Sequence, residues 1–108
     1  MIKELSINEF VEFEKNHPLS NLYQTINYAL LRSEDGYDYE LIGYLDEDNN
    51  ILAASLILLK PIANKYLYGY APRGFLIDFN NTQLLEKFTK ALVEYYGNKN
   101  VVFIKINP

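Results

Sequence analysis

The chain contains no cysteine and no tryptophan, and its 108 residues include a single methionine. Without cysteine it can form neither a disulfide nor a thiolate zinc site, and it has no thiol nucleophile. Long apolar runs are also absent, since the longest, Ile51 to Leu59, is about half the length of a membrane-spanning helix. The first ten residues lack the apolar core of a signal peptide. We therefore expect a cytoplasmic protein without a membrane span.

Clusters of positive charge and paired glycines are missing as well. The ten lysines and arginines are scattered along a chain of net charge −4, whereas proteins that bind nucleic acids gather cations on one face. The five glycines form no Gly-x-Gly pair of the kind that cradles a pyrophosphate. His17 has no partner at metal spacing, and the acidic turn 46–50 lacks the glycine and distal glutamate of a calcium loop. We expect no metal and no cofactor.

Apolar and aromatic residues are plentiful, with 49% hydrophobic residues that include ten tyrosines and six phenylalanines. This is enough for one core, so we expect a single domain over residues 1–108. Ser6 and Glu9 have capping-box spacing and predict the start of a first helix. A second helix is predicted from near Asn21 to Arg32, with Leu30 on its buried side.

The hydrophobic pattern changes its period after residue 36 and then predicts strands. Three strands joined by short turns form an antiparallel meander, and a further helix and strand follow. The meander strands span Tyr39 to Leu45, Ile51 to Leu59 and Lys65 to Tyr70; the helix runs from Asn80 to Gly97, and the last strand from Val101 to Ile106. With a short strand at residues 2–5, the order is strand, two helices, three strands, helix, strand. This predicts an α/β (α+β) fold, the first part of a GNAT-type acyltransferase lobe.

One segment has a distinctive order. Residues 66–78, Tyr-Leu-Tyr-Gly-Tyr-Ala-Pro-Arg-Gly-Phe-Leu-Ile-Asp, join an aromatic strand to a Pro-Arg-Gly corner and a second apolar run. This segment resembles a signature of the FemABX family, the aminoacyltransferases that build peptidoglycan cross-bridges. Residues 21–32, 51–59 and 102–108 resemble further segments of the same family in the same order.

The resemblance implies a function. Fem proteins transfer amino acids from aminoacyl-tRNA to peptidoglycan precursor peptides, carried on UDP-muramyl-pentapeptide or lipid II. They are much longer than this chain, so the resemblance implies a fragment of a GNAT-like Fem lobe that holds the precursor. The aminoacyl-tRNA would bind through a missing part of the protein, and the isolated chain is expected to be inactive.

The resemblance also implies substrate-binding residues. Arg32, at the end of the second helix, occupies the position of a basic residue that contacts the phosphates of the precursor. A guanidinium can bind phosphate through two hydrogen bonds and stays charged at cellular pH, although an arginine also suits a solvated helix end. Asn107 occupies the position of the family's terminal aspartate. Asparagine cannot act as a general base, so either Asn107 only positions substrate, or the substrate itself relays the proton, or the chain comes from a divergent member of the family. The catalytic residues stay open.

Two further candidates belong to the corner of residues 66–78. Arg73 and Gly74 are expected to face the substrate, although Arg73 could instead pair with Asp78.

The tyrosines of the preceding strand alternate with smaller residues and therefore share one face. Tyr70 could line a sugar or peptide groove, or the row Tyr66, Tyr68 and Tyr70 could fill the core beside the helix that follows.

Two other functions remain open. One is a coenzyme A-dependent N-acetyltransferase of the same fold. The other is a non-catalytic module that binds a protein partner, or forms a homodimer, through the unpaired edge of the strand Val101 to Ile106.

Overall fold

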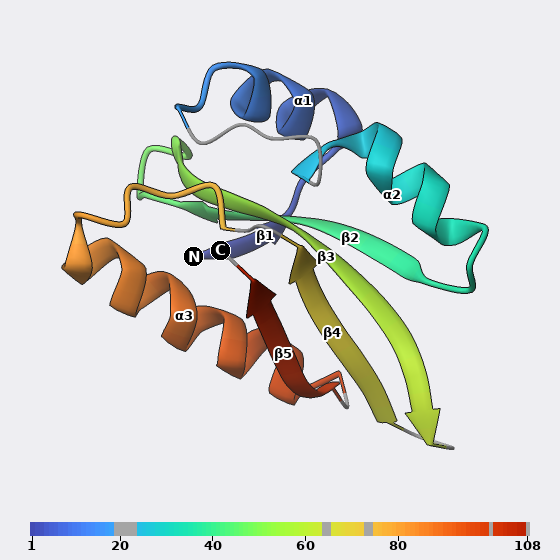
Figure 1. The fold of residues 1–108 in the computed structure, drawn as a ribbon. Coiled ribbons are helices and arrows are strands. Elements are labelled where there is room, and N and C mark those ends of the chain that lie inside the picture. Colours follow the sequence, from blue (N-terminus) through green and yellow to red (C-terminus); the bar gives the residue numbers. More distant parts are fainter. Residues whose placement is uncertain (19–23, 64–65, 73–74, 100, 108) are drawn as a thin grey trace.

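The computed structural model describes residues 1–18, 24–63, 66–72, 75–99 and 101–107. Its elements follow the predicted order (Figure 1). They are β1 (Ile2–Glu4), α1 (Ile7–Lys15), α2 (Ile26–Ser33), β2 (Asp38–Leu45), β3 (Ile51–Ala63), β4 (Tyr66–Pro72), α3 (Thr82–Gly97) and β5 (Val101–Asn107).

The five strands form one sheet in the order β1-β2-β3-β4-β5. Neighbours from β1 to β4 are antiparallel, which confirms the predicted meander, and β5 is parallel to β4. Parallel neighbours need a crossover connection, and α3 supplies it. Figure 1 shows α1 and α2 on one side of the sheet and α3 on the other, so the protein has three layers.

The central strand β3 is buried on both faces, as its apolar sequence predicts. Successive side chains of a strand point to opposite faces, so Ile57 packs on the side of α3 while Leu56 and Leu58 pack on the side of α1 and α2. We call the two clusters the α3-side core and the α1/α2-side core. The α3-side core comprises Ile42, Ala53, Ile57, Leu59, Ala71, Phe75, Ile77, Phe88, Leu92 and Tyr96. The α1/α2-side core comprises Leu5, Phe10, Ala29, Leu41, Leu45, Ala54, Leu56, Leu58 and Leu76.

Helix α1 begins as its sequence predicts. The Glu9 amide donates to the Ser6 hydroxyl over 3.1 Å, and the Ser6 amide donates to the Glu9 carboxylate over 2.9 Å. These two bonds satisfy amides that have no partner within the helix. The bond from the Ser6 backbone, together with nearby Lys3, holds the pKa of Glu9 below its usual value. The capping box is confirmed.

Helix α2 differs from its prediction. It begins at Ile26 with Thr25 as the N-cap, and the predicted start at Asn21 lies outside the described residues. Leu30 was expected on the buried face but is 51% exposed, so that expectation is wrong. The side of α2 that faces the sheet is set by Ala29, which is fully buried. Leu30 follows Ala29 by one residue, which is about 100° further around the helix axis, and therefore points away from the sheet.

Candidate substrate-binding site

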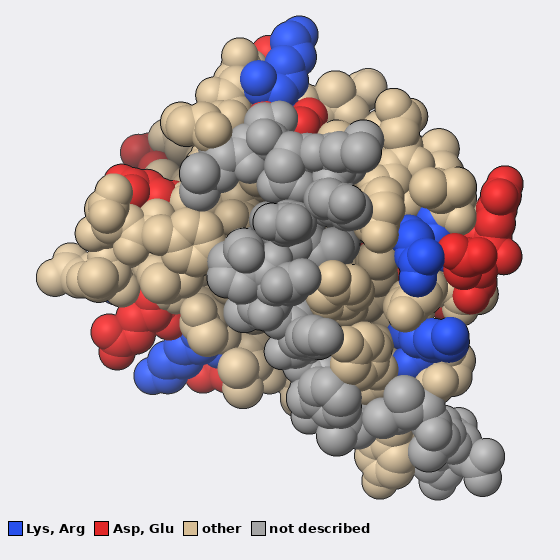
Figure 2. Space-filling view, in the orientation of Figure 1, with Lys and Arg blue, Asp and Glu red and all other residues tan. Residues whose placement is uncertain are grey.

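Arg32 lies in the last turn of α2, at the connection to β2. Its Nη1 donates to Asp35 Oδ2 over 2.9 Å, and its guanidinium carbon lies 4.9 Å from the centre of the Tyr37 ring. Partial burial lowers the pKa of Arg32, but the hydrogen bond with Tyr37 and the nearby Tyr28 and Asp35 more than offset this and raise it. The guanidinium is therefore a fixed, permanently charged group. Figure 2 shows basic side chains next to acidic ones on the side of the molecule where α2 ends.

The tyrosine row of β4 faces the α1/α2 side of the sheet. In the antiparallel register Tyr70 pairs with Leu58 and Tyr68 with Lys60. Leu58 belongs to the α1/α2-side core, and Tyr70 packs against that core while remaining partly exposed. The expectation that the row fills the core beside α3 is therefore wrong. Alternation predicts that these tyrosines share a face, but the choice of face depends on which helix covers it.

The end of β4 meets the end of β5. Because the two strands are parallel, their carboxyl ends lie at the same edge of the sheet, and Pro72 pairs with Asn107. The backbone of Asn107 thus lies beside Pro72, the last residue of β4. Arg73, Gly74 and the side chain of Asn107 lie outside what the structure describes, so their predicted contacts stay predictions.

Asp78 has a structural role in the turn that precedes α3. Its Oδ1 accepts from the Asn80 amide over 3.0 Å, and its backbone carbonyl accepts from the Asn81 amide over 3.0 Å. Asn81 is the N-cap of α3, so the predicted helix start at Asn80 is one residue early. Asp78 therefore shapes the entry into α3.

Gln24 has a role that its sequence position does not reveal. Its side chain is fully buried and binds the backbone of Leu56 twice: Nε2 donates to the carbonyl over 3.3 Å, and Oε1 accepts from the amide over 2.8 Å. The ladder between β3 and β4 reaches Leu58–Tyr70, and an isolated bridge joins Ala54 to Leu76. Leu56 lies between these two pairs and has no strand partner on this side among the described residues. The Gln24 carboxamide instead forms the two backbone hydrogen bonds that a neighbouring strand would form.

The carboxamide explains how the sheet tolerates a corner after β4. The chain leaves β3 after Tyr70 and returns at Leu76, which would leave the polar groups of Leu56 unpaired. Gln24 satisfies both groups from a position 32 residues away in sequence. Sequence reasoning missed this role because nothing local predicts it: Gln24 lies among other polar residues such as Thr25 and Asn27.

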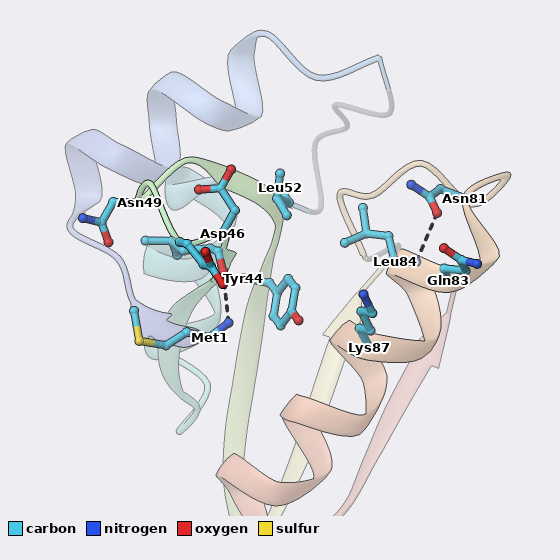
Figure 3. A pocket seen from close by; sticks show the side chains of 11 residues that line it. Met1, Tyr44, Asp46, Asn49, Leu52, Asn81, Gln83, Leu84 and Lys87 are labelled. Atoms are coloured by element: carbon cyan, nitrogen blue, oxygen red, sulfur yellow. Dashed lines mark hydrogen bonds between the residues drawn. The ribbon is translucent and has the colours of Figure 1, made fainter.

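A separate open cleft lies at the other end of the molecule, between the β2–β3 turn and the start of α3 (Figure 3). Its volume is about 590 Å³, and Asp46 and Leu52 face Asn81 and Lys87 across it. Asp46 is engaged in its own turn, where Oδ1 accepts from the Asn50 amide over 2.9 Å, and these bonds hold its pKa below the usual value. Of the predicted site residues, Arg32 and Tyr70 have described side chains, and neither lines this cleft. Its mixed charges indicate no particular ligand.

The described parts of the chain hold neither a metal-ligand cluster nor a membrane-spanning helix. Among them no group of three or more histidine, cysteine, aspartate or glutamate side chains could hold a metal ion. No helix in these parts is long and apolar enough to cross a membrane.

The fold defines the class of protein. A strand, two helices, a three-stranded meander, a crossover helix and a parallel strand constitute the first half of a GNAT-like lobe. A crystal structure of FemX superposes on the whole chain with a TM-score of 0.84 at 24% identity, over 27% of its own length. A mutant of the BH1408 protein from Bacillus halodurans also has this fold, with a TM-score of 0.60 at 15% identity over 82% of its length.

The family follows from the sequence. The model of the FemAB family matches residues 5–108, and the chain belongs to this family. Aminoacyltransferase FemB of Staphylococcus epidermidis is 32% identical over 106 residues, which are 97% of this chain. Aminoacyltransferase FemA of Staphylococcus aureus is 30% identical over 104 residues, or 96% of this chain. The chain spans 25% of the length of each.

Proposed function

We propose that this chain is the precursor-binding part of a peptidoglycan aminoacyltransferase. The parent activity would join an amino acid from aminoacyl-tRNA to an amine of a muramyl-peptide precursor, in the cytoplasm where charged tRNA is found. Membership of the FemAB family and the names of the relatives, aminoacyltransferases FemA and FemB, support this activity. Since the chain spans a quarter of those relatives, the aminoacyl-tRNA would bind to parts that this chain does not contain.

The observation that carries the proposal is the placement of Arg32 relative to β4. Arg32 contacts Tyr37, and the tyrosine row of β4 runs along the same side of the sheet towards the pair Pro72–Asn107. From Tyr68 to Pro72 a strand extends by about 13 Å. This track suits an elongated ligand whose phosphates bind at Arg32 and whose peptide extends towards the corner. Amide formation from an activated ester depends mainly on such placement, together with an oxyanion stabiliser.

Binding of the precursor tests the proposal. We would titrate the ¹⁵N-labelled chain with UDP-muramyl-pentapeptide and follow amide shifts. Saturable shifts near Arg32 and along residues 68–72, lost in Arg32→Ala and retained in Lys90→Ala, are expected. Lys90 is exposed on α3 and controls for removal of one positive charge. A folded wild-type chain that gives no shifts would contradict the proposal.

Turnover is a second measurement on the same sample. We expect no product from the isolated chain with charged tRNA and precursor, since the proposed site holds only one substrate. Tight binding of acetyl-coenzyme A would instead indicate an N-acetyltransferase.

A non-catalytic interaction module is the second candidate function. One observation favours it: β5 is the last strand of the sheet, and its outer edge pairs with no other strand among the described residues. Such an edge can add a strand from a partner or from a second copy. Sedimentation that gives a dimer, together with no affinity for muramyl nucleotides, would favour this function over precursor binding.

A further inference from the structure

Lys60 shares an aromatic ring with Arg32. Its Nζ lies 5.1 Å from the centre of the Tyr37 ring, and the guanidinium carbon of Arg32 lies 4.9 Å from the same centre. Both distances fall within the range in which a cation is attracted by the negative face of an aromatic ring. Two positive charges that are far apart in sequence, one from α2 and one from β3, therefore contact the same ring.

The fold explains why Lys60 reaches this position. Lys60 follows Leu56 and Leu58 at every second residue of β3, so it leaves the sheet on the side of α1 and α2. Its partner in the register is Tyr68, the first member of the proposed track. Beyond Leu58 the apolar core ends and the Lys60 side chain is exposed. Its ammonium is thus both accessible and held at the Arg32 end of the track.

The charges at this point are not balanced. Arg32 is partly neutralised by Asp35, whereas Lys60 forms no ion pair within the described parts of the chain. The two cations lie 4.9 and 5.1 Å from the centre of the Tyr37 ring, so an anion that binds beside this ring would be attracted by both charges. A guanidinium binds a phosphoryl group through two hydrogen bonds, while an ammonium acts as a point charge, so the pair suits two linked phosphoryl groups.

We infer that Lys60 and Arg32, held by Tyr37, form one diphosphate-binding site, in which Arg32 binds one phosphoryl group and Lys60 the other. The inference rests on the proposed function, because it names a second residue for the phosphates of the precursor. It adds a role for Lys60, and it makes Tyr37 a positioning residue that acts through both cations.

The test compares charge removal at the two cations. Affinity for UDP-muramyl-pentapeptide and for inorganic pyrophosphate would be measured by calorimetry on the wild-type chain, Lys60→Gln, Arg32→Ala and the control Lys90→Gln. We expect Lys60→Gln to weaken the binding of both ligands roughly tenfold. Lys60→Arg should keep most of the affinity, and Lys90→Gln should leave the affinity unchanged. Orthophosphate offers only one phosphoryl group. Lys60→Gln should therefore reduce the affinity for orthophosphate less than it reduces the affinity for pyrophosphate.

The possible results separate the inference from the proposed function. If Arg32→Ala abolishes precursor binding while Lys60→Gln leaves it unchanged, the role of Lys60 is overturned and the proposed function stands. If pyrophosphate binding depends on both cations but the precursor does not bind, the anion site stands and the precursor function fails. Tyr37→Leu should weaken pyrophosphate binding more than Tyr37→Phe, because the ring contacts both cations whereas the hydroxyl bonds only to Arg32. Equal affinities in both variants would overturn the positioning role of Tyr37.

Discussion

The two faces of the sheet are filled with different kinds of side chain. On the side of α3 the core is mostly apolar, although it also holds the buried Ser55 and the hydroxyl of Tyr96, and Phe75 and Phe88 meet edge to face with ring centres 4.7 Å apart. On the side of α1 and α2 the core contains the buried amide of Gln24 and is bordered by tyrosines and by Arg32. From this comparison we expect changes on the α3 side to affect mainly stability, and changes on the α1/α2 side to affect both stability and the proposed binding of the precursor. Changes on the two faces should therefore have different consequences.

The largest loss of stability is expected on the α3 side. Phe88→Ala removes a fully buried ring from the α3-side core and should lower the free energy of unfolding by about 3–5 kcal/mol. Urea denaturation measures this, with Val93→Ala as the control because Val93 is 64% exposed on the same helix. The contrast between the two faces fails if Phe88→Ala lowers the free energy of unfolding no more than Val93→Ala does. It also fails if the Phe88→Ala variant stays folded but loses its affinity for the precursor.

A smaller loss with a different pattern is expected at Gln24. Gln24→Leu keeps the size of the side chain but leaves the amide and carbonyl of Leu56 without their partner, which should cost about 1–3 kcal/mol in all, since burial of the leucine side chain offsets part of the loss. The Leu56 amide should also exchange with solvent faster, as hydrogen exchange would measure. The matched control is Gln83→Leu, an exposed glutamine in the first turn of α3. Unchanged exchange at Leu56 would contradict the role of Gln24.

The smallest effect concerns His17, the only histidine, at the end of α1. Partial burial lowers its pKa below the ordinary 6.5, although Asp78 acts in the opposite direction. The unfolded chain then binds a proton more readily than the folded one. Stability from this residue is present above the unfolded pKa and is lost as the pH falls below it. An NMR titration of the imidazole should give a folded pKa below 6.5, and a value above 6.5 would reverse the sign.

Local signals in the sequence predicted most of the elements. The spacing of Ser6 and Glu9 predicted the start of α1, and the continuous apolar run of β3 predicted a strand covered on both sides. Arg32 was predicted from a family resemblance, and the structure adds its contacts with Asp35 and Tyr37.

Long-range contacts explain what could not be predicted. The carboxamide of Gln24 reaches a strand 32 residues away, and the face chosen by Tyr70 depends on where α1 and α2 settle on the sheet. The proximity of Lys60 to Arg32 arises only when β3 passes beneath the end of α2. None of these contacts leaves a periodic or spacing signal in the sequence.

The double burial of β3 has a consequence for handling the protein. Residues 51–59 contain a single polar side chain, that of Ser55, and no charge or proline. When the chain unfolds, this stretch loses both helical covers and becomes a segment of high β-propensity that can pair with copies of itself. Refolding should therefore compete with aggregation, and its yield should fall as the protein concentration rises. A charged residue at Leu52, which is 40% exposed in the fold, is the substitution that would slow self-association at the least cost to the native core.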